Sequence, residues 1–305
     1  TCRMVALPMT FKNAIAEIDA FTNHPKSDIL YRNYTSAVQQ QWSGPLVLGQ
    51  LLDQYHGSSI DLMHRDALAE ILKMLTCGEL VAWTVSSQLA AEINELEGKL
   101  AATAQASDEA RHLNTFRLYA PTRGLNIENY DSLPDATYNG FSQVLAAPTL
   151  AHRLVGMQLM VEPVAIVLFE ELRRVNVCPV LTDLLAYYKL DEARHIQFGT
   201  NFLPYVLKKL SRTQLMHLFA WQITILMKEI DGLKAYEPHL KALGIDPLRL
   251  FTLAQAKQAA ALDEILDELN LPSAISMAVQ GLFRLKMDHT FHNVSYLQAF
   301  QYFQG

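Results

Sequence analysis

The pentapeptide Asp-Glu-Ala-Arg-His occurs twice in this chain, at residues 108–112 and 191–195. In each copy a glutamate precedes a histidine by three residues, which places both side chains on one face of a helix, about one turn apart. Another glutamate lies 30 residues before the glutamate of each copy. The repeated spacing therefore predicts two pairs of helices that carry six polar residues in a fixed order: Glu79, Glu109, His112, Glu162, Glu192 and His195.

These six residues match the ligand types of a dinuclear metal site. Two helices that each give a Glu, with two that each give Glu-x-x-His, form the ligand set of a di-iron or di-manganese carboxylate site in a four-helix bundle. The competing interpretation is a coincidence of surface side chains on amphipathic helices. Glu162 argues against this interpretation, because residues 159–161 before it and residues 164–167 after Pro163 are all apolar. An unpaired carboxylate in such surroundings would be costly.

The turn signals agree with this pairing of helices. If Glu79 and Glu109 lie level on antiparallel helices, the turn falls midway, at Asn94. The midpoint between Glu162 and Glu192 is Val177, which follows Asn176 and lies two residues before Pro179, a favourable first-turn residue. Each glutamate is then about 15 residues, or roughly 22 Å, from its turn, so the metals would lie in the middle of the bundle.

The rest of the chain also shows helical periodicity, and the expected class is all-α. We expect helices over about 66–92, 95–118, 150–176 and 179–210, with a turn-rich crossover over 119–148 that contains a short helix. Helices at 1–65 and 211–305, the last of them over about 273–303, would extend this bundle within a single domain, 1–305. Pro163 removes a backbone N–H and should interrupt the third helix, which would allow Glu162 to change its binding mode.

Composition narrows the function classes. Half of the residues are hydrophobic and the formal net charge is −6, which disfavours a general nucleic-acid-binding surface. The three cysteines are far apart without a Cys-x-x-Cys pair, a usage typical of the reducing cytosol. The most apolar run, 154–169, is interrupted by polar residues and is too short to span a membrane comfortably. We therefore expect a cytoplasmic protein that binds neither nucleic acid nor membrane.

The six residues and their spacing resemble the ferritin-like di-iron carboxylate superfamily. Its members include bacterioferritin, the ribonucleotide reductase small subunit, acyl-carrier desaturases, multicomponent monooxygenases and p-aminobenzoate N-oxygenase. The resemblance covers about residues 66–210. It implies a ferritin-like four-helix bundle, two iron ions (or manganese, or a mixed Mn/Fe pair) and O2 as co-substrate.

In the monooxygenases the Asp and Arg of one Asp-Glu-x-Arg-His copy hold the ligand histidine of the other. The resemblance thus implies that Asp191 and Arg194 support His112, and that Asp108 and Arg111 support His195. A metal-bound imidazole needs such a partner to fix its tautomer and orientation. Tyr188, on the same helix face as Glu192 and His195, is a further candidate for contact with the ligands.

Departures from the subfamilies guide the functional prediction. The position of the radical tyrosine of the reductase subunit is Phe116 here, which argues against that role. The threonines of the desaturases and the monooxygenases correspond to Ala165 and Ile166, and the extra ligand histidine of the N-oxygenase corresponds to Tyr188. Phe116 and Trp83, each four residues after a predicted ligand, are expected in the core.

The leading expectation is an oxygenase that hydroxylates or N-oxygenates a small organic substrate. It would take electrons from a separate reductase or ferredoxin and act as a homodimer. The alternatives are an O2-dependent desaturase or oxidase of an acyl-type substrate, and a non-catalytic iron-binding or ferroxidase protein.

Overall fold

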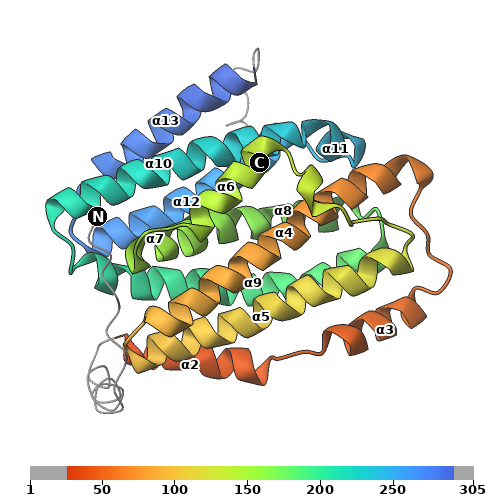
Figure 1. The fold of residues 1–305 in the computed structure, drawn as a ribbon, viewed down its shortest axis with the longest axis horizontal. Coiled ribbons are helices and arrows are strands. Elements are labelled where there is room, and N and C mark those ends of the chain that lie inside the picture. The colour runs from red at the N-terminus through yellow and green to blue at the C-terminus, as the bar shows by residue number, and fades with distance from the viewer. Residues whose placement is uncertain (1–25, 292–305) are drawn as a thin grey trace.

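The computed structural model describes residues 26–291, and within this range every regular element is helical. Four long segments form a central bundle (Figure 1). They are α4 (Leu62–Glu92), α5 (Leu96–Thr122), a composite third segment and α9 (Pro179–Leu207). The third segment consists of α7 (Leu150–Leu154), the π-helical η2 (Val155–Val161) and α8 (Glu162–Val175). The prediction of an all-α four-helix bundle is confirmed.

The turns within the bundle lie where the sequence placed them. Asn94 lies between α4 and α5. Asn176 ends α8 in the left-handed conformation, with φ of 50°, which asparagine tolerates better than most residues. Pro179 is the first residue of α9, where its missing N–H leaves no hydrogen bond unmade. The helix start expected at Asp66 is too late, because nothing interrupts the helix between Leu62 and that residue.

The crossover between the two helix pairs contains the predicted short helix. It holds a single 3₁₀ turn, η1 (Tyr130–Ser132), and α6 (Asp135–Leu145). Helix α6 packs against α10 (Arg212–Ala235) and against α4. The crossover thereby forms an outer layer over one face of the bundle.

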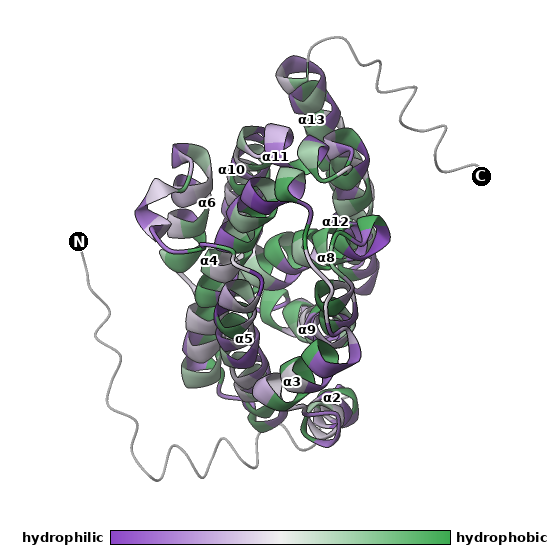
Figure 2. Cartoon of the chain, turned by 90° about the vertical axis from the view of Figure 1, so that its right-hand side faces the viewer, coloured by the Kyte–Doolittle hydropathy of each residue, from purple (hydrophilic) through white to green (hydrophobic). Residues whose placement is uncertain are grey.

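The remaining helices cover the bundle from two sides (Figure 2). On one side α2 (Ser27–Gln39) and α3 (Gly44–Gln54) pack against α5 and α9. On the other, α11 (Glu237–Ala242) packs on α4, α12 (Pro247–Glu268) on α8, and α13 (Ala274–Thr290) on α10 and α12. The predicted end of the last helix, near residue 303, lies outside the described residues.

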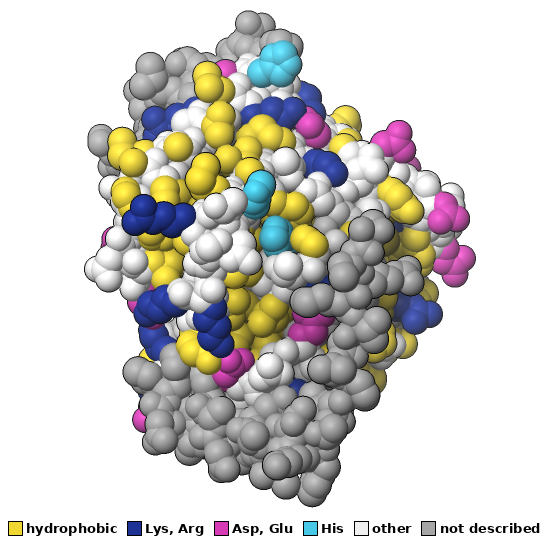
Figure 3. Space-filling model, turned by 60° about the vertical axis from the view of Figure 1, so that its left-hand side comes forward, with side chains coloured by type: hydrophobic (Ala, Val, Ile, Leu, Met, Phe, Trp, Pro, Cys, Tyr) yellow, Lys and Arg dark blue, Asp and Glu magenta, His cyan; other side chains and the backbone are white. Residues whose placement is uncertain are grey.

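The outer surface is mixed in character. Figure 3 shows hydrophobic, basic, acidic and histidine side chains next to one another on one face. Within residues 26–291, no helix is long and apolar enough to cross a membrane.

The interruption expected at Pro163 takes the form of the π-helical segment η2. Proline lacks the N–H that would continue the α-helical hydrogen bonds of the preceding turn, and the turn widens. Gly199 of α9 faces this segment. A Cβ atom on that residue would lie 2.3 Å from Cβ of Gln158, so only glycine allows α9 and η2 to approach so closely. Glu162 is the first α-helical residue after the widened turn.

Candidate metal centre

The four segments of the bundle bring the six predicted residues together in its interior. Each of these residues is at most 5% exposed to solvent, and each of the four segments contributes at least one of them. They form two overlapping groups whose ligand atoms lie within 4.8 Å of one another: Glu79, Glu109, His112 and Glu192, and Glu109, Glu162, Glu192 and His195. Glu109 and Glu192 belong to both groups, so each is placed to bridge two metal ions.

In the first group, three carboxylates surround one ring nitrogen of His112. The distance from its Nδ1 is 3.4 Å to Oε2 of Glu79, 3.4 Å to Oε2 of Glu109 and 3.4 Å to Oε1 of Glu192. The other ring nitrogen, Nε2, points away from this group toward Asp191. The imidazole thus presents one nitrogen to the carboxylate cage.

The second group repeats this arrangement around His195. Its Nδ1 lies 3.0 Å from Oε1 of Glu109, 3.2 Å from Oε2 of Glu192 and 3.6 Å from Oε1 of Glu162. Its Nε2 faces Asp108 at 3.4 Å. Both histidines therefore turn the same nitrogen inward and the same nitrogen outward.

These distances fit metal coordination. Donor atoms about 2.1 Å from a metal ion lie roughly 3.0–3.4 Å from one another in octahedral or tetrahedral geometry. Two inward-facing atoms, Nδ1 of His112 and Oε2 of Glu109, are buried and have no hydrogen-bond partner among the described residues. Four buried glutamates would also match the charge of two divalent cations. The residues present therefore fit a dinuclear centre.

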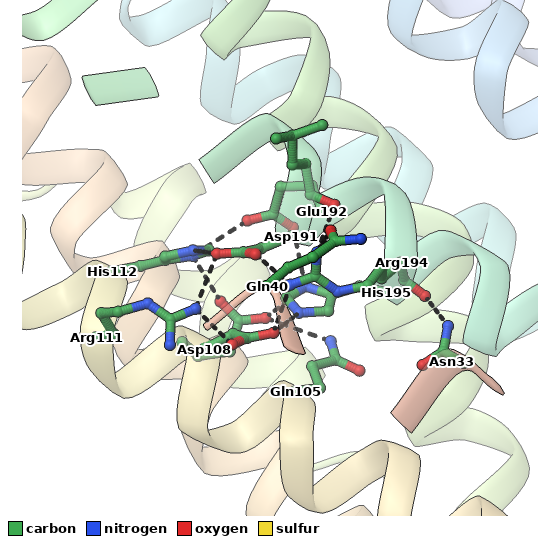
Figure 4. A network of polar contacts seen from close by, with 12 residues as sticks. Asn33, Gln40, Gln105, Asp108, Arg111, His112, Asp191, Glu192, Arg194 and His195 are labelled. Atoms are coloured by element: carbon green, nitrogen blue, oxygen red, sulfur yellow. Dashed lines mark hydrogen bonds and ion pairs between the residues drawn. The ribbon is translucent and has the colours of Figure 1, made fainter. Parts of the chain in front are cut away.

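Hydrogen bonds cross from each copy of the repeated pentapeptide to the other (Figure 4). The carboxylate of Asp191 accepts from Nε2 of His112 at 3.0 Å, and that of Asp108 faces Nε2 of His195 at 3.4 Å. Both arginines contact both aspartates. Arg111 donates to Asp108 at 2.5 Å and to Asp191 at 2.9 Å, and Arg194 donates to Asp191 and, at 3.4 Å, to Asp108. The positive charges of the two arginines thus balance the negative charges of the two aspartates.

The protonation pattern shows how strongly the cluster requires positive charge. Burial raises the pKa of Glu79 and Glu162 well above the usual range, and at Glu162 the charges of Glu192 and Glu109 raise it further. Burial lowers the pKa of both histidines, but the facing carboxylates outweigh it and the net pKa of each is raised. Metal binding would therefore be coupled to the release of protons from these groups.

Aromatic side chains pack around the His112 half. The ring of Tyr188 stacks on that of His112 with centroids 4.1 Å apart, and its hydroxyl donates to the backbone carbonyl of His112 at 2.8 Å. Trp42, from the segment between α2 and α3, donates through Nε1 to Asp191 at 2.8 Å. The sequence pointed to Tyr188 but not to Trp42, which is 149 residues away from its partner.

Two glutamines hold the His195 half, and sequence reasoning missed their role. Gln105 donates to Oε1 of Glu162 at 2.6 Å and to Oε1 of Glu109 at 3.3 Å, and Gln158 donates to Oε1 of Gln105 at 2.6 Å. A signal was present, because each glutamine precedes a candidate ligand by four residues and so shares its helix face. Gln158 also lies within the otherwise apolar run.

Two aromatic residues were expected in the core, and the structure confirms one of these predictions but not the other. Phe116 is fully buried, as predicted. The prediction for Trp83 is wrong, since 40% of this residue is exposed. Four residues advance a helix by about 400°, which is 40° past a full turn, and on α4 this rotation carries Trp83 out of the interior.

An apolar cavity of about 110 Å³ lies beside the cluster, between α4, α6, α8 and α10. Gly78 and Val161, the residues directly before Glu79 and Glu162, are part of its wall. Most of the remaining wall is aliphatic or aromatic, including Ala165 and Phe141. The cavity is therefore suited to an apolar molecule next to the metal centre.

Comparisons with solved structures settle the fold. A putative class I ribonucleotide reductase from Bacillus halodurans matches with a TM-score of 0.64 and 15% identity, over 86% of this chain and 99% of that chain. The chain has the ferritin-like fold. A Synechococcus protein with aldehyde deformylating oxidase activity matches with a TM-score of 0.59 and 17% identity, over 72% of this chain and 97% of that one.

A variant of an R2-like ligand-binding oxidase with a Mn/Fe cofactor matches with a TM-score of 0.61 and 15% identity, over 88% of this chain and 100% of that chain. Neither a protein-family model nor a curated protein sequence matches this chain. The likeness to these structures therefore lies in the arrangement of the helices.

Proposed function

We propose that this protein is an O2-dependent oxidoreductase that holds two iron ions and oxidises a small, mainly apolar organic substrate by oxygen insertion. The observation that carries the proposal is the cage of four glutamates and two histidines beside an apolar cavity. Structures of similar fold come from proteins described as oxidases or as a ribonucleotide reductase, and one has a Mn/Fe cofactor. The same oxygen and nitrogen ligands also suit manganese.

In this proposal each of the six residues binds metal. Glu79 and His112 would hold one ion, Glu162 and His195 the other, and Glu109 and Glu192 would bridge them. Two ferrous ions so held would supply electrons to bound O2, and an external reductase or ferredoxin would restore them. Insertion consumes one O2, two electrons and two protons for each substrate molecule, and yields the oxygenated product and water.

The protein residues would fix the site and exclude water. Asp191 and Asp108 accept the outer N–H of each histidine, which leaves Nδ1 as the lone-pair donor to metal. The apolar wall of the cavity would bring the substrate close to the metals while keeping bulk water out. Phe116, buried against Tyr188, cannot form a tyrosyl radical, which favours substrate oxidation over radical storage.

The test is single-turnover oxidation with ¹⁸O2. Protein loaded with two ferrous ions is mixed with ¹⁸O2 and a panel of small apolar substrates, and the products are analysed by mass spectrometry. A product that contains ¹⁸O supports the proposal. A dehydrogenated product without the label would indicate a desaturase or oxidase, and iron oxidation with continued uptake of iron but no organic product would indicate a ferroxidase. The assembly mass would separate the expected homodimer from a storage cage.

A further inference from the structure

A carboxyl-bearing side chain lines the apolar cavity, on a helix that supplies none of the six cluster residues. It belongs to Glu229 of α10, which also lines a second cavity of about 10 Å³ between α8, α10, α12 and α13. Its Oε1 is shielded from water and has no hydrogen-bond partner among the described residues. Leaving such a buried group unpaired is destabilising, so a bound molecule that pairs with it gains affinity.

The other oxygen of this carboxyl is already paired. Nε2 of Gln258, on α12, donates to Oε2 of Glu229 at 3.0 Å and to the backbone carbonyl of Met160 at 3.0 Å. Since Oε2 accepts this hydrogen bond, a proton on the carboxyl belongs on Oε1. A protonated Glu229 therefore offers one O–H donor on its unpaired side.

The surroundings favour this protonated form. Burial raises the pKa of Glu229 to about 8, and the hydrogen bond from Gln258 lowers it only in part. Among the described residues, Lys228 is the single other titratable residue in the walls of the two cavities. The other wall residues, from α4, α6, η2, α8, α10, α12 and α13, do not titrate. A cationic ligand would meet this lysine in an apolar space, whereas a neutral oxygen acceptor would not be repelled.

Resting on the proposed function, we infer that the substrate is an apolar molecule with one uncharged oxygen acceptor, such as a ketone carbonyl, and that Glu229 donates a hydrogen bond to it. The rest of the substrate would pack on the aliphatic wall beside Gly78 and Val161. Glu229 would thus select the substrate and set its position relative to the metals. A water molecule in the small cavity is the competing partner, since about 10–15 Å³ is enough to hold one.

Three probes of nearly equal shape test this assignment: ethylbenzene, acetophenone and 1-phenylethylamine. Their dissociation constants are measured by calorimetry on metal-loaded protein without O2, for the wild type, Glu229→Leu and Glu229→Gln. The preference for acetophenone over ethylbenzene should fall about three- to tenfold in Glu229→Leu. It should stay within about twofold in Glu229→Gln, whose amide still donates. Ile225→Val, in the same wall, is the matched control and should leave the preference unchanged.

The wild type provides a second readout that needs no variant. The carbonyl stretching frequency of bound acetophenone should lie below its value in alkane solvent at pH 7. It should return toward that value as the pH rises through about 8, because the ionised carboxyl cannot donate. In Glu229→Gln the frequency should not change with pH.

Two results would overturn the inference. One is an alkane-like carbonyl frequency in the wild type with an unchanged preference in Glu229→Leu, as expected if water occupies Oε1. The other is tightest binding of 1-phenylethylamine that both variants abolish, which would mean that an ionised Glu229 binds cations. Because these measurements exclude O2, they are independent of the ¹⁸O2 test, and either proposal can fail while the other stands.

Discussion

The two halves of the candidate metal centre carry the same ligand types but are built differently. The His112 half lies on the regular helices α4 and α5 and is packed by the rings of Tyr188 and Trp42. The His195 half includes Glu162, which follows a π-helical segment and is held by Gln105. The repeated sequence thus supplies the candidate ligands of both halves. The difference in support leads us to expect that the Glu162 side is the one that rearranges.

The largest expected difference between the halves comes from replacing, one at a time, the two glutamates that belong to a single group, Glu162 and Glu79. Glu162→Ala should reduce bound metal from two ions per chain to none. The freed amide of Gln105, already 3.3 Å from Glu109, would pull this bridging carboxylate away, and a cavity would remain. Glu79→Ala should leave one ion in the His195 half. Elemental analysis after iron reconstitution measures both, with Glu70→Ala on the same helix as a control. Two ions in Glu162→Ala would refute the ligand assignment.

Acidification should weaken metal binding in both halves of the centre to the same extent. Each contains one glutamate and one histidine whose pKa is raised, and metal binding must displace their protons. Affinity should therefore fall as the pH is lowered, by about tenfold per pH unit for each proton displaced, and should rise toward neutral pH. Competition with a chelator between pH 5 and 8 measures this. A fall for one ion only would show that the halves are not equivalent in charge.

Replacing either of the two crossed aspartates should weaken metal binding in one half of the centre by about 10- to 100-fold relative to the other half. Asp191→Ala should chiefly perturb His112, and Asp108→Ala should chiefly perturb His195. The first effect should be larger, since the Asp191 contact is 3.0 Å and the Asp108 contact is 3.4 Å. Nitrogen NMR of labelled histidines reads each ring separately. Equal perturbation of both rings by either variant would contradict the crossed arrangement.

The smallest expected effect concerns the π-helical segment. Gly199→Ala places a methyl group 2.3 Å from Cβ of Gln158, which must move and disturb the link through Gln105 to Glu162. We expect a several-fold loss of oxidation rate with little change at His112. Gly49→Ala is the matched control, because its Cβ would meet no atom within 4 Å. An unchanged rate in Gly199→Ala would mean that the glutamine chain does not position Glu162.

The sequence predicted those features that depend on helical spacing. The bundle, its turns at Asn94 and before Pro179, and the convergence of six polar residues follow from local periodicity. It could not predict contacts that depend on how outer helices pack. The hydrogen bond from Trp42 to Asp191 spans 149 residues, and the cavity requires α6 and α10 to meet. Pro163 indicated an interruption of the helix, but the sequence did not show that it would take a π-helical form packed closely against Gly199.

Anomalous diffraction from crystals of the iron-loaded protein, recorded at the iron absorption edge, tests the central claim most directly. Two peaks are predicted, about 3.5–4 Å apart, as in other dinuclear sites. One should lie beside Nδ1 of His112 and the other beside Nδ1 of His195, with Glu109 and Glu192 between them. A single peak, or peaks away from these two nitrogens, would contradict the account.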